Sequence, residues 1–319
     1  MVKAYGRQRL IDMETANQNE REVKEKVTDK LEEIVKHGDK FLPFSRYFGD
    51  CRIFKDVYTH WHKEMECIYI RRGRGTFQIN KATVVGHEGD LILIEKEAIH
   101  HIRSSRRDIL HFESIVFDLK MMQCVIEDLC QIAFVEPLIK KKVTFNPIVR
   151  TGDDGYKEIS QAFFYILKIY QEKEAYYYVA LKAALFQFFY QLLRGGYMEM
   201  AQEEETRQIE AIKMVLDYIH AHYSESITAK EMADMVHYSE YHFMKLFKVY
   251  TGKTLISYIN EYRIERSKYE LLKTNQTIDE IADQVGFCTT SYYIQLFQRI
   301  EGVTPNKFRK EQVLEGLHS

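Results

Sequence analysis

The sequence lacks the cysteine patterns that mark disulfide frameworks and zinc knuckles. Its five cysteines are scattered without CxxC or CxxxxC spacing, so we interpret them as small apolar residues. It also has no run of eighteen apolar residues, and no apolar stretch follows the basic residues at its start. We therefore expect neither a membrane span nor a signal peptide, and we expect a cytoplasmic protein.

Common enzyme motifs are missing too. There is no nucleophile elbow, phosphate-binding loop or GxGxxG, which argues against an enzyme. A strong positive charge is also absent, because the formal net charge is -2. Between Lys230 and Lys310 the balance is 12 basic to 10 acidic residues. Nucleic-acid binding by this region would therefore depend on geometry and be sensitive to salt.

Four regions of different pattern follow one another along the 319 residues. Residues 15–37 have apolar positions at helical spacing, with Gly38 as a natural stop, and predict an N-terminal helical extension within residues 1–40. Residues 41–118 are rich in Ile, Val, Tyr and Phe between glycines and predict a small antiparallel barrel. Residues 119–200 return to helical spacing, with a boundary expected near Gly195-Gly196 and the acidic run 203–205.

The helical region 119–200 carries two apolar stripes. Such aromatic-rich stripes are typical of a core or a subunit interface, so we expect this region to support the barrel and to form a homodimer. The stripes consist of Ile159, Phe163, Ile166, Leu167 and Tyr170, and of Leu181, Ala184, Leu185, Phe188, Phe189 and Leu192.

The last third of the chain contains a repeat. The segment from Thr228 to Val236 recurs 49 residues later, from Thr277 to Val285, and each copy opens with a capping box and precedes a second predicted helix. Ser239 in the first copy and Thr289 or Thr290 in the second are predicted helix caps. The second helices end at glycines 50 residues apart, Gly252 and Gly302.

Helical periodicity predicts which side chains of these second helices are buried and which are exposed. Between the copies, residues 255–273 contain no breaker and predict one helix of roughly 28 Å, close to the ~34 Å separation of successive major grooves. The predicted inward residues are Phe243, Leu246, Phe247 and Tyr250 in the first copy, and Tyr293, Leu296 and Phe297 in the second.

The region from Ile227 to Arg309 resembles the DNA-binding domain of the AraC/XylS family. The segments that carry this resemblance are Ile281-Ala282, Gly286-Phe287, Ser291-Tyr292-Tyr293, Phe297 and Gly302-Val303-Thr304-Pro305. It implies a transcription regulator that binds double-stranded DNA and RNA polymerase, more commonly as an activator. The positions it implies as DNA-facing are Tyr241, His242, Met244, Lys245, Lys248, Thr290, Ser291, Ile294 and Gln295.

The second copy departs from that family at two positions. Gln295 stands where the family often has Arg, and Gln298 where it often has Lys. Glutamine can read adenine through paired hydrogen bonds but does not anchor phosphate as a cation. We therefore expect one cationic and one neutral reading helix.

Residues 60–66 carry the spacing HxH(x)3E, followed by Gly73, and Gly89-Asp90 precedes His100. These segments resemble the two motifs of cupin barrels, although Lys96 and Ala98 replace the usual Pro and Gly before the last histidine. Cupins that bind metal hold it with such a set of histidines and one carboxylate. The corresponding residues here are His60, His62, Glu66 and His100.

Three interpretations of this cluster stay open. It could bind a small polar effector such as a sugar, bind a divalent transition metal, or consist of barrel residues satisfied among themselves. No cofactor is required by the first and third. A cupin enzyme uses the same ligands, but fusion to a DNA-binding domain favours sensing over catalysis.

The predicted fold class is α+β. We expect a cupin-like, effector-binding barrel over 41–118 and supporting helices over 119–200. An all-α domain of two helix-turn-helix units, joined by a long helix, is expected over 206–312.

Overall fold

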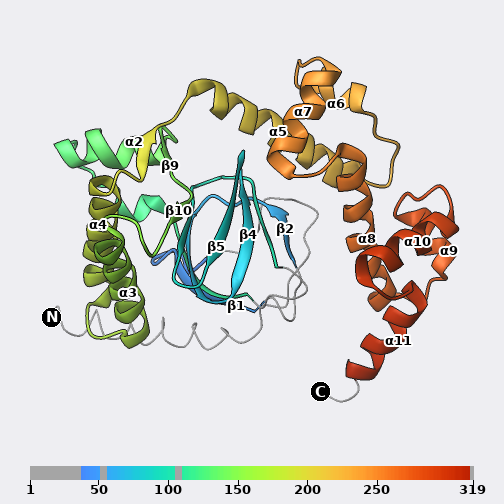
Figure 1. Cartoon of the computed structure of the whole chain (residues 1–319), viewed down its shortest axis with the longest axis horizontal. Coiled ribbons are helices and arrows are strands. Elements are labelled where there is room, and N and C mark those ends of the chain that lie inside the picture. Colours follow the sequence, from blue (N-terminus) through green and yellow to red (C-terminus); the bar gives the residue numbers. More distant parts are fainter. Residues whose placement is uncertain (1–36, 51–55, 105–109, 317–319) are drawn as a thin grey trace.

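A computed structural model describes residues 37–50, 56–104 and 110–316 (Figure 1). The predicted helix over 15–37 lies almost wholly outside these residues. Within the described part of the chain, no helix is long and apolar enough to cross a membrane.

The N-terminal half contains a barrel of two facing antiparallel sheets, as the strand pattern predicts. One sheet has five strands in the order β1-β8-β3-β6-β10, and the other has four in the order β2-β7-β4-β5. The strands of the first sheet are β1 (Phe44–Asp50), β8 (His111–Phe117), β3 (Met65–Arg72), β6 (Leu91–Ile94) and β10 (Ile148–Val149). Those of the second are β2 (Asp56–His60), β7 (His100–Arg103), β4 (Arg74–Ile79) and β5 (Ala82–His87).

The five-stranded sheet is apolar on both faces because both faces are covered. In β6, Ile92 and Ile94 face the barrel interior, while Leu91 and Leu93 face the helices outside. Side chains alternate between faces along a strand, so all four residues of β6 are buried. A continuous apolar run therefore replaces the alternation expected of a sheet with one wet face.

Two antiparallel helices cover the outer face of that sheet, α3 (Tyr156–Glu172) and α4 (Tyr177–Arg194) (Figure 1). Their apolar stripes lie in one hydrophobic cluster with Phe44, Met65 and Phe117 of the sheet. The two predicted stripes therefore belong to the hydrophobic core between these helices and the sheet. The remaining elements of this region are η2 (Leu119–Met122), the π-helix η3 (Gln131–Val135), α2 (Glu136–Ile139), β9 (Val143–Phe145) and β11 (Met198–Met200).

The acidic run 203–205, which the sequence places at a domain boundary, begins a helix. It forms the first turn of α5 (Glu203–His222), where carboxylates interact favourably with the helix dipole. In Figure 1, α5 runs from the barrel to the C-terminal helices. Its residues Ile212, Leu216 and Ile219 are buried in the core of those helices.

The C-terminal domain consists of two helix pairs around a long helix. The first pair is α6 (Ala229–Met235) and α7 (Glu240–Thr251), and the second is α9 (Ile278–Gln284) and α10 (Thr290–Glu301). The long helix is α8 (Leu255–Lys273), and α11 (Pro305–Gly316) follows α10. One end of α8 is buried with α5, α6 and α7, and the other with α9 and α10.

The helix ends agree with the sequence prediction. Thr228 with Glu231 and Thr277 with Glu280 form the two capping boxes, and Ser239 and Thr289 cap the second helix of each pair. The glycines that end α7 and α10 have φ angles of 70° and 81°. The predicted boundaries of the long helix, 255 and 273, are also confirmed.

Candidate DNA-binding surface and candidate ligand site

Helix α7 exposes the side chains that the sequence predicts to face DNA. Tyr241, His242, Lys245 and Lys248 are exposed, and Met244 is half-buried. The opposite face is anchored by Phe243, Leu246, Phe247 and Tyr250, which are buried. Burial of this stripe therefore determines which face of α7 remains available to a partner.

Helix α10 presents a less charged face. Ser291 and Gln295 are exposed, and Thr290 and Ile294 are half-buried. Tyr292, which the sequence-based selection missed, is 47% exposed, and its hydroxyl accepts a hydrogen bond from Asn260 Nδ2 on α8 at 3.1 Å. Exposure at helical spacing on the same face would have identified it.

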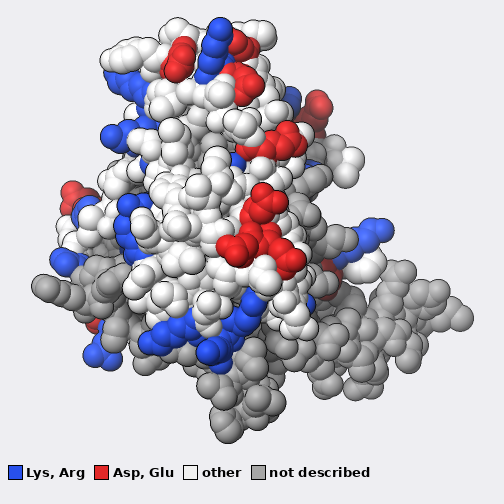
Figure 2. Space-filling view, turned by 90° about the vertical axis from the view of Figure 1, so that its right-hand side faces the viewer, with Lys and Arg blue, Asp and Glu red and all other residues white. Residues whose placement is uncertain are grey.

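Charge on this side of the molecule is mixed. Figure 2 shows Lys and Arg side chains mainly at the left and the lower edge of the face drawn, acidic ones mainly at its centre right and top, and largely uncharged surface between them. Within α7, Lys245 and Lys248 are exposed cations, whereas the corresponding region of α10 has Gln295 and Gln298. The two exposed helix faces thus differ in charge, as predicted from the sequence.

The structure brings the four predicted ligand-site residues together. Ligand nitrogens of His60, His62 and His100 all lie within 4.8 Å of one another. Glu66 Oε2 lies 3.4 Å from His62 Nε2 and 3.8 Å from His100 Nε2. His60 and His100 are paired across β2 and β7, and Glu66 comes from β3 in the facing sheet. His37, not predicted, is near this cluster, with its ring centroid 5.4 Å from that of His62.

Two histidines have the hydrogen bonds typical of metal ligands. The Nδ1 of His100 is 2.8 Å from the Ala98 carbonyl, and that of His62 is 3.1 Å from the Glu64 carbonyl. A carbonyl only accepts, so Nδ1 carries a proton in both rings. In a neutral His100 ring this leaves the lone pair on Nε2, whereas the Nε2 of His62 is within hydrogen-bond distance of the Glu66 carboxylate. Within the described part of the chain, His100 Nε2 is buried without a hydrogen-bond partner. Burial, with His60 and His62 nearby, lowers the pKa of His100 and favours the neutral form that binds metal.

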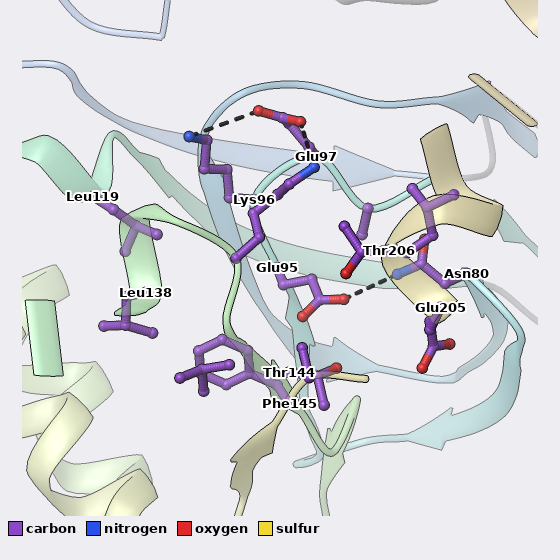
Figure 3. Close-up of a pocket in the computed structure, with 15 residues that line it drawn as sticks. Asn80, Glu95, Lys96, Glu97, Leu119, Leu138, Thr144, Phe145, Glu205 and Thr206 are labelled. Carbon is purple, nitrogen blue, oxygen red and sulfur yellow. Dashed lines mark hydrogen bonds and ion pairs between the residues drawn. The ribbon is translucent and has the colours of Figure 1, made fainter. Parts of the chain in front are cut away.

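A cavity of about 40 Å³ opens elsewhere, between the barrel, the supporting helices and α5. A groove of about 290 Å³ shares several of its residues. Figure 3 shows the Glu95 carboxylate directed to the amide of Asn80, with Thr144 and Glu205 nearby. The sequence did not predict this site because its residues come from elements distant in the chain.

Among the titratable residues that line this cavity, Glu95 has a strongly raised pKa. Burial, reinforced by Glu205, raises its pKa from 4.5 to about 7, although Thr144 and Asn80 lower it through hydrogen bonds. Between about pH 4.5 and pH 7, Glu95 is therefore protonated in the folded chain and ionised in the unfolded chain. The free energy of unfolding therefore decreases as the pH rises from about 4.5 to about 7, and it stays at this lower value at higher pH.

Replacing Glu95 with glutamine should remove this pH-dependent loss. We expect Glu95→Gln to stabilise the chain at pH 8 by on the order of 2 kcal/mol and to have little effect at pH 5, because the amide needs no proton. Urea unfolding at both pH values measures this. Glu88→Gln, at an exposed position, is the control and should show no such difference. Equal effects of Glu95→Gln at the two pH values would contradict the assignment.

Comparisons with known proteins match both halves of the chain. Residues 232–311 match a family model described as a helix-turn-helix domain, and residues 55–116 match a cupin domain. The chain is 26% identical over 286 residues to the uncharacterized HTH-type transcriptional regulator YdeC of Bacillus subtilis, covering 89% of this chain and 97% of YdeC.

Two further proteins show partial similarity. The bifunctional transcriptional activator/DNA repair enzyme AdaA of Bacillus subtilis is 35% identical over 116 residues, which are 36% of this chain and 55% of AdaA. A crystal structure of ToxT from Vibrio cholerae with a bound unsaturated fatty acid aligns with a TM-score of 0.40 and 13% identity. That alignment covers 83% of this chain and 94% of ToxT.

The two domain matches agree with the architecture. The helix-turn-helix match runs from α6 into α11, and the cupin match lies within the two-sheet barrel. Similarity to YdeC extends over both domains. The chain therefore combines a cupin domain with an AraC-type helix-turn-helix domain, the architecture of a DNA-binding transcription regulator.

Proposed function

We propose that α7 and α10 enter adjacent major grooves of double-stranded DNA and read its sequence. The observation that carries this proposal is the exposure of matching faces on two capped helices, held by one helix of 19 residues. That length is roughly 28 Å, close to one turn of the duplex. The proposed contacts are Tyr241, His242, Met244, Lys245, Lys248, Thr290, Ser291, Ile294 and Gln295.

We further propose that the barrel senses a divalent transition metal through His60, His62 and His100, with Glu66 as the nearby carboxylate. The orphaned Nε2 of His100 supports this assignment, because a buried polar atom without a partner carries a free-energy cost that a metal would relieve. When bound, the metal would supply charge and crosslink β2 to β7. The histidine cluster would then sense the metal and would have no catalytic role.

A small polar effector, such as a sugar, is the second candidate for the sensed ligand. The groove of about 290 Å³ favours it, since this volume approaches that of ligand pockets and its lining includes Asn80, Glu95, Thr144 and Glu205. A thermal-shift screen with cell extract would distinguish the two sites. A shift abolished in Glu95→Gln but kept in His100→Ala favours the groove, and the reverse result favours the histidine cluster.

The proposed assembly is a homodimer that binds DNA in the cytoplasm and recruits RNA polymerase, acting as an activator. An apolar stripe on α4 supports the dimer, because Val179, Tyr190 and Leu193 are 60%, 51% and 47% exposed at heptad-like spacing. These side chains lie away from the face that packs on the sheet. Sedimentation of wild type and Tyr190→Glu would test this contact.

Substitutions in the two reading helices should have different salt dependence. Lys245→Ala and Gln295→Ala are each expected to weaken binding to a selected duplex by about 1–3 kcal/mol. Only Lys245→Ala should also reduce the slope of log affinity against log salt, by about one, because it removes a cation. Fluorescence anisotropy over a salt series measures both quantities.

Lys168→Ala is the matched control, since Lys168 is exposed on α3, outside the reading helices. If both reading-helix variants bind as the wild type does, the proposed orientation of α7 and α10 is wrong.

Metal content tests the proposed ligand directly. Chain purified without chelator should contain close to one equivalent of a transition metal, or should take up one equivalent of added Zn²⁺. Glu66→Ala should lower the affinity and retain the stoichiometry if the three histidines are the principal ligands. Absence of any bound equivalent under both conditions would refute the metal proposal and leave the DNA-binding proposal intact.

A further inference from the structure

Each histidine of the ligand cluster is adjacent in sequence to a residue that contacts the DNA-binding domain. His60 and His62 flank Trp61, and His100 is flanked by Ile99 and His101. Adjacent residues of an extended chain point to opposite sides. Segments 60–62 and 99–101 therefore face the cluster with one set of side chains and the C-terminal domain with the other.

Trp61 packs into the core of the C-terminal domain. It is 9% exposed and belongs to the same hydrophobic cluster as Ile212 and Leu216 of α5 and Phe247 of α7. The Lys213 Nζ lies 4.2 Å from the centroid of a Trp61 ring, within the range of a cation–π interaction. The buried core of the first helix-turn-helix unit thus extends to a residue between two predicted metal ligands.

A polar connection runs beside this apolar one. The Glu97 amide donates to the His62 carbonyl at 2.8 Å, and the Glu97 carboxylate accepts from Lys213 Nζ at 3.3 Å and from Lys141 Nζ at 3.0 Å. Burial alone would raise the pKa of Glu97, but Lys213 and Lys141 hold it at about 2. Glu97 is therefore a stable carboxylate that joins the His62 backbone to α5.

Further contacts with α7 come from β7 and from its neighbour β4. Gln78 Nε2, on β4 beside β7, donates to the Val249 carbonyl of α7 at 3.0 Å. At the end of α7, Gly252 lies against His101, because a Cβ at this glycine would be 3.4 Å from the His101 ring. Segments 60–62 and 99–101 therefore both contact α7 or its end.

We propose that Trp61, with Lys213, couples metal occupancy of the histidine cluster to the docking of the DNA-binding domain. This inference rests on the proposed metal site. Metal bound by ligands on both segments holds 60–62 and 99–101 in one arrangement and seats Trp61 and Ile99 on α5. Loss of the metal releases that constraint and loosens α5 and α7 from the barrel.

Hydrogen exchange of the full-length chain tests this coupling with Zn²⁺ as the probe. We expect one equivalent of Zn²⁺ to slow amide exchange in 212–219 of α5 and 246–250 of α7 by about fivefold or more. In Trp61→Leu this slowing should disappear although Zn²⁺ still binds. Lys213→Met is a second variant that removes the charge, keeps the apolar stem and leaves the barrel sequence unchanged. Arg207→Met, at an exposed position of the same helix, should respond as the wild type does.

The same protein samples should also show the coupling in their affinity for DNA, measured with a duplex selected from a random pool. By linkage, the factor by which Zn²⁺ changes DNA affinity must equal the factor by which DNA changes Zn²⁺ affinity. A factor of about fivefold or more in the wild type and near one in Trp61→Leu and Lys213→Met supports the coupling. Zn²⁺ binding without slowed exchange, or an unchanged response in both variants, would overturn it. Failure of the wild type to bind Zn²⁺ would instead refute the metal site on which it rests.

Discussion

Gly286→Ala is expected to destabilise the second helix pair by roughly 2–4 kcal/mol. Gly286 follows α9 with φ of 92°, where an L side chain is strained. A Cβ there would lie 2.6 Å from the Ser224 carbonyl oxygen and 2.8 Å from its Cα. Arg263 donates to the carbonyls of Tyr223 and Glu225 and so restrains the segment that would have to move. Backbone strain at Gly286 and steric overlap of the new Cβ with Ser224 therefore both destabilise the variant.

Urea unfolding and hydrogen exchange would measure this effect, with loss of protection concentrated in α9 and α10. The first helix pair provides a matched control, since His237 follows Thr228 by the same nine residues as Gly286 follows Thr277. His237 already has φ of 58° and is exposed, so His237→Ala should change stability by only a few tenths of a kcal/mol. Equal effects at both positions would show that the contact with Ser224 is unimportant.

His100→Ala is expected to abolish the stabilisation that metal confers on the barrel. A ligand at one hundred times its dissociation constant stabilises the folded chain by about 2.7 kcal/mol. His100 is buried, and a ligand nitrogen of its ring lies within 4.8 Å of those of His60 and His62, so its loss leaves two of the three clustered histidines. The difference in unfolding free energy with and without Zn²⁺ is the quantity to compare, because it cancels the cost of the cavity left by the imidazole.

His87→Ala is the control for this measurement. The His87 side chain is 58% exposed at the end of β5, outside the cluster, so the variant should keep the full response to Zn²⁺. A Zn²⁺-induced stabilisation that persists in His100→Ala would place the metal elsewhere in the chain.

Local sequence signals predicted the C-terminal domain in detail. The capping boxes bring together residues three positions apart, and the glycines after α7 and α10 act on the turn they belong to. The buried stripe of each second helix follows from the period of 3.6 residues. All of these interactions form within one or two turns of helix, so neighbours in the sequence determine them.

The ligand cluster was predictable in composition and not in geometry. The spacing of His60, His62 and Glu66 with His100 indicated a cupin-type set, but it left effector, metal and self-satisfied interpretations open. Pairing of His60 with His100 across β2 and β7 and the orphaned Nε2 favour a metal. Strand register and burial produce these features, and both depend on the whole barrel.

The sequence by itself thus determined the two domain types, the two helix pairs and the chemical types at both candidate sites. Only the tertiary structure placed Trp61 on Lys213 and Glu97 beside it, because these contacts join residues more than a hundred positions apart. The tertiary structure also shows that the acidic run is the first turn of α5 and that a cavity lies beside Glu95. Packing of one domain against another leaves no periodic pattern in the sequence, so it depends on the complementarity of the two surfaces.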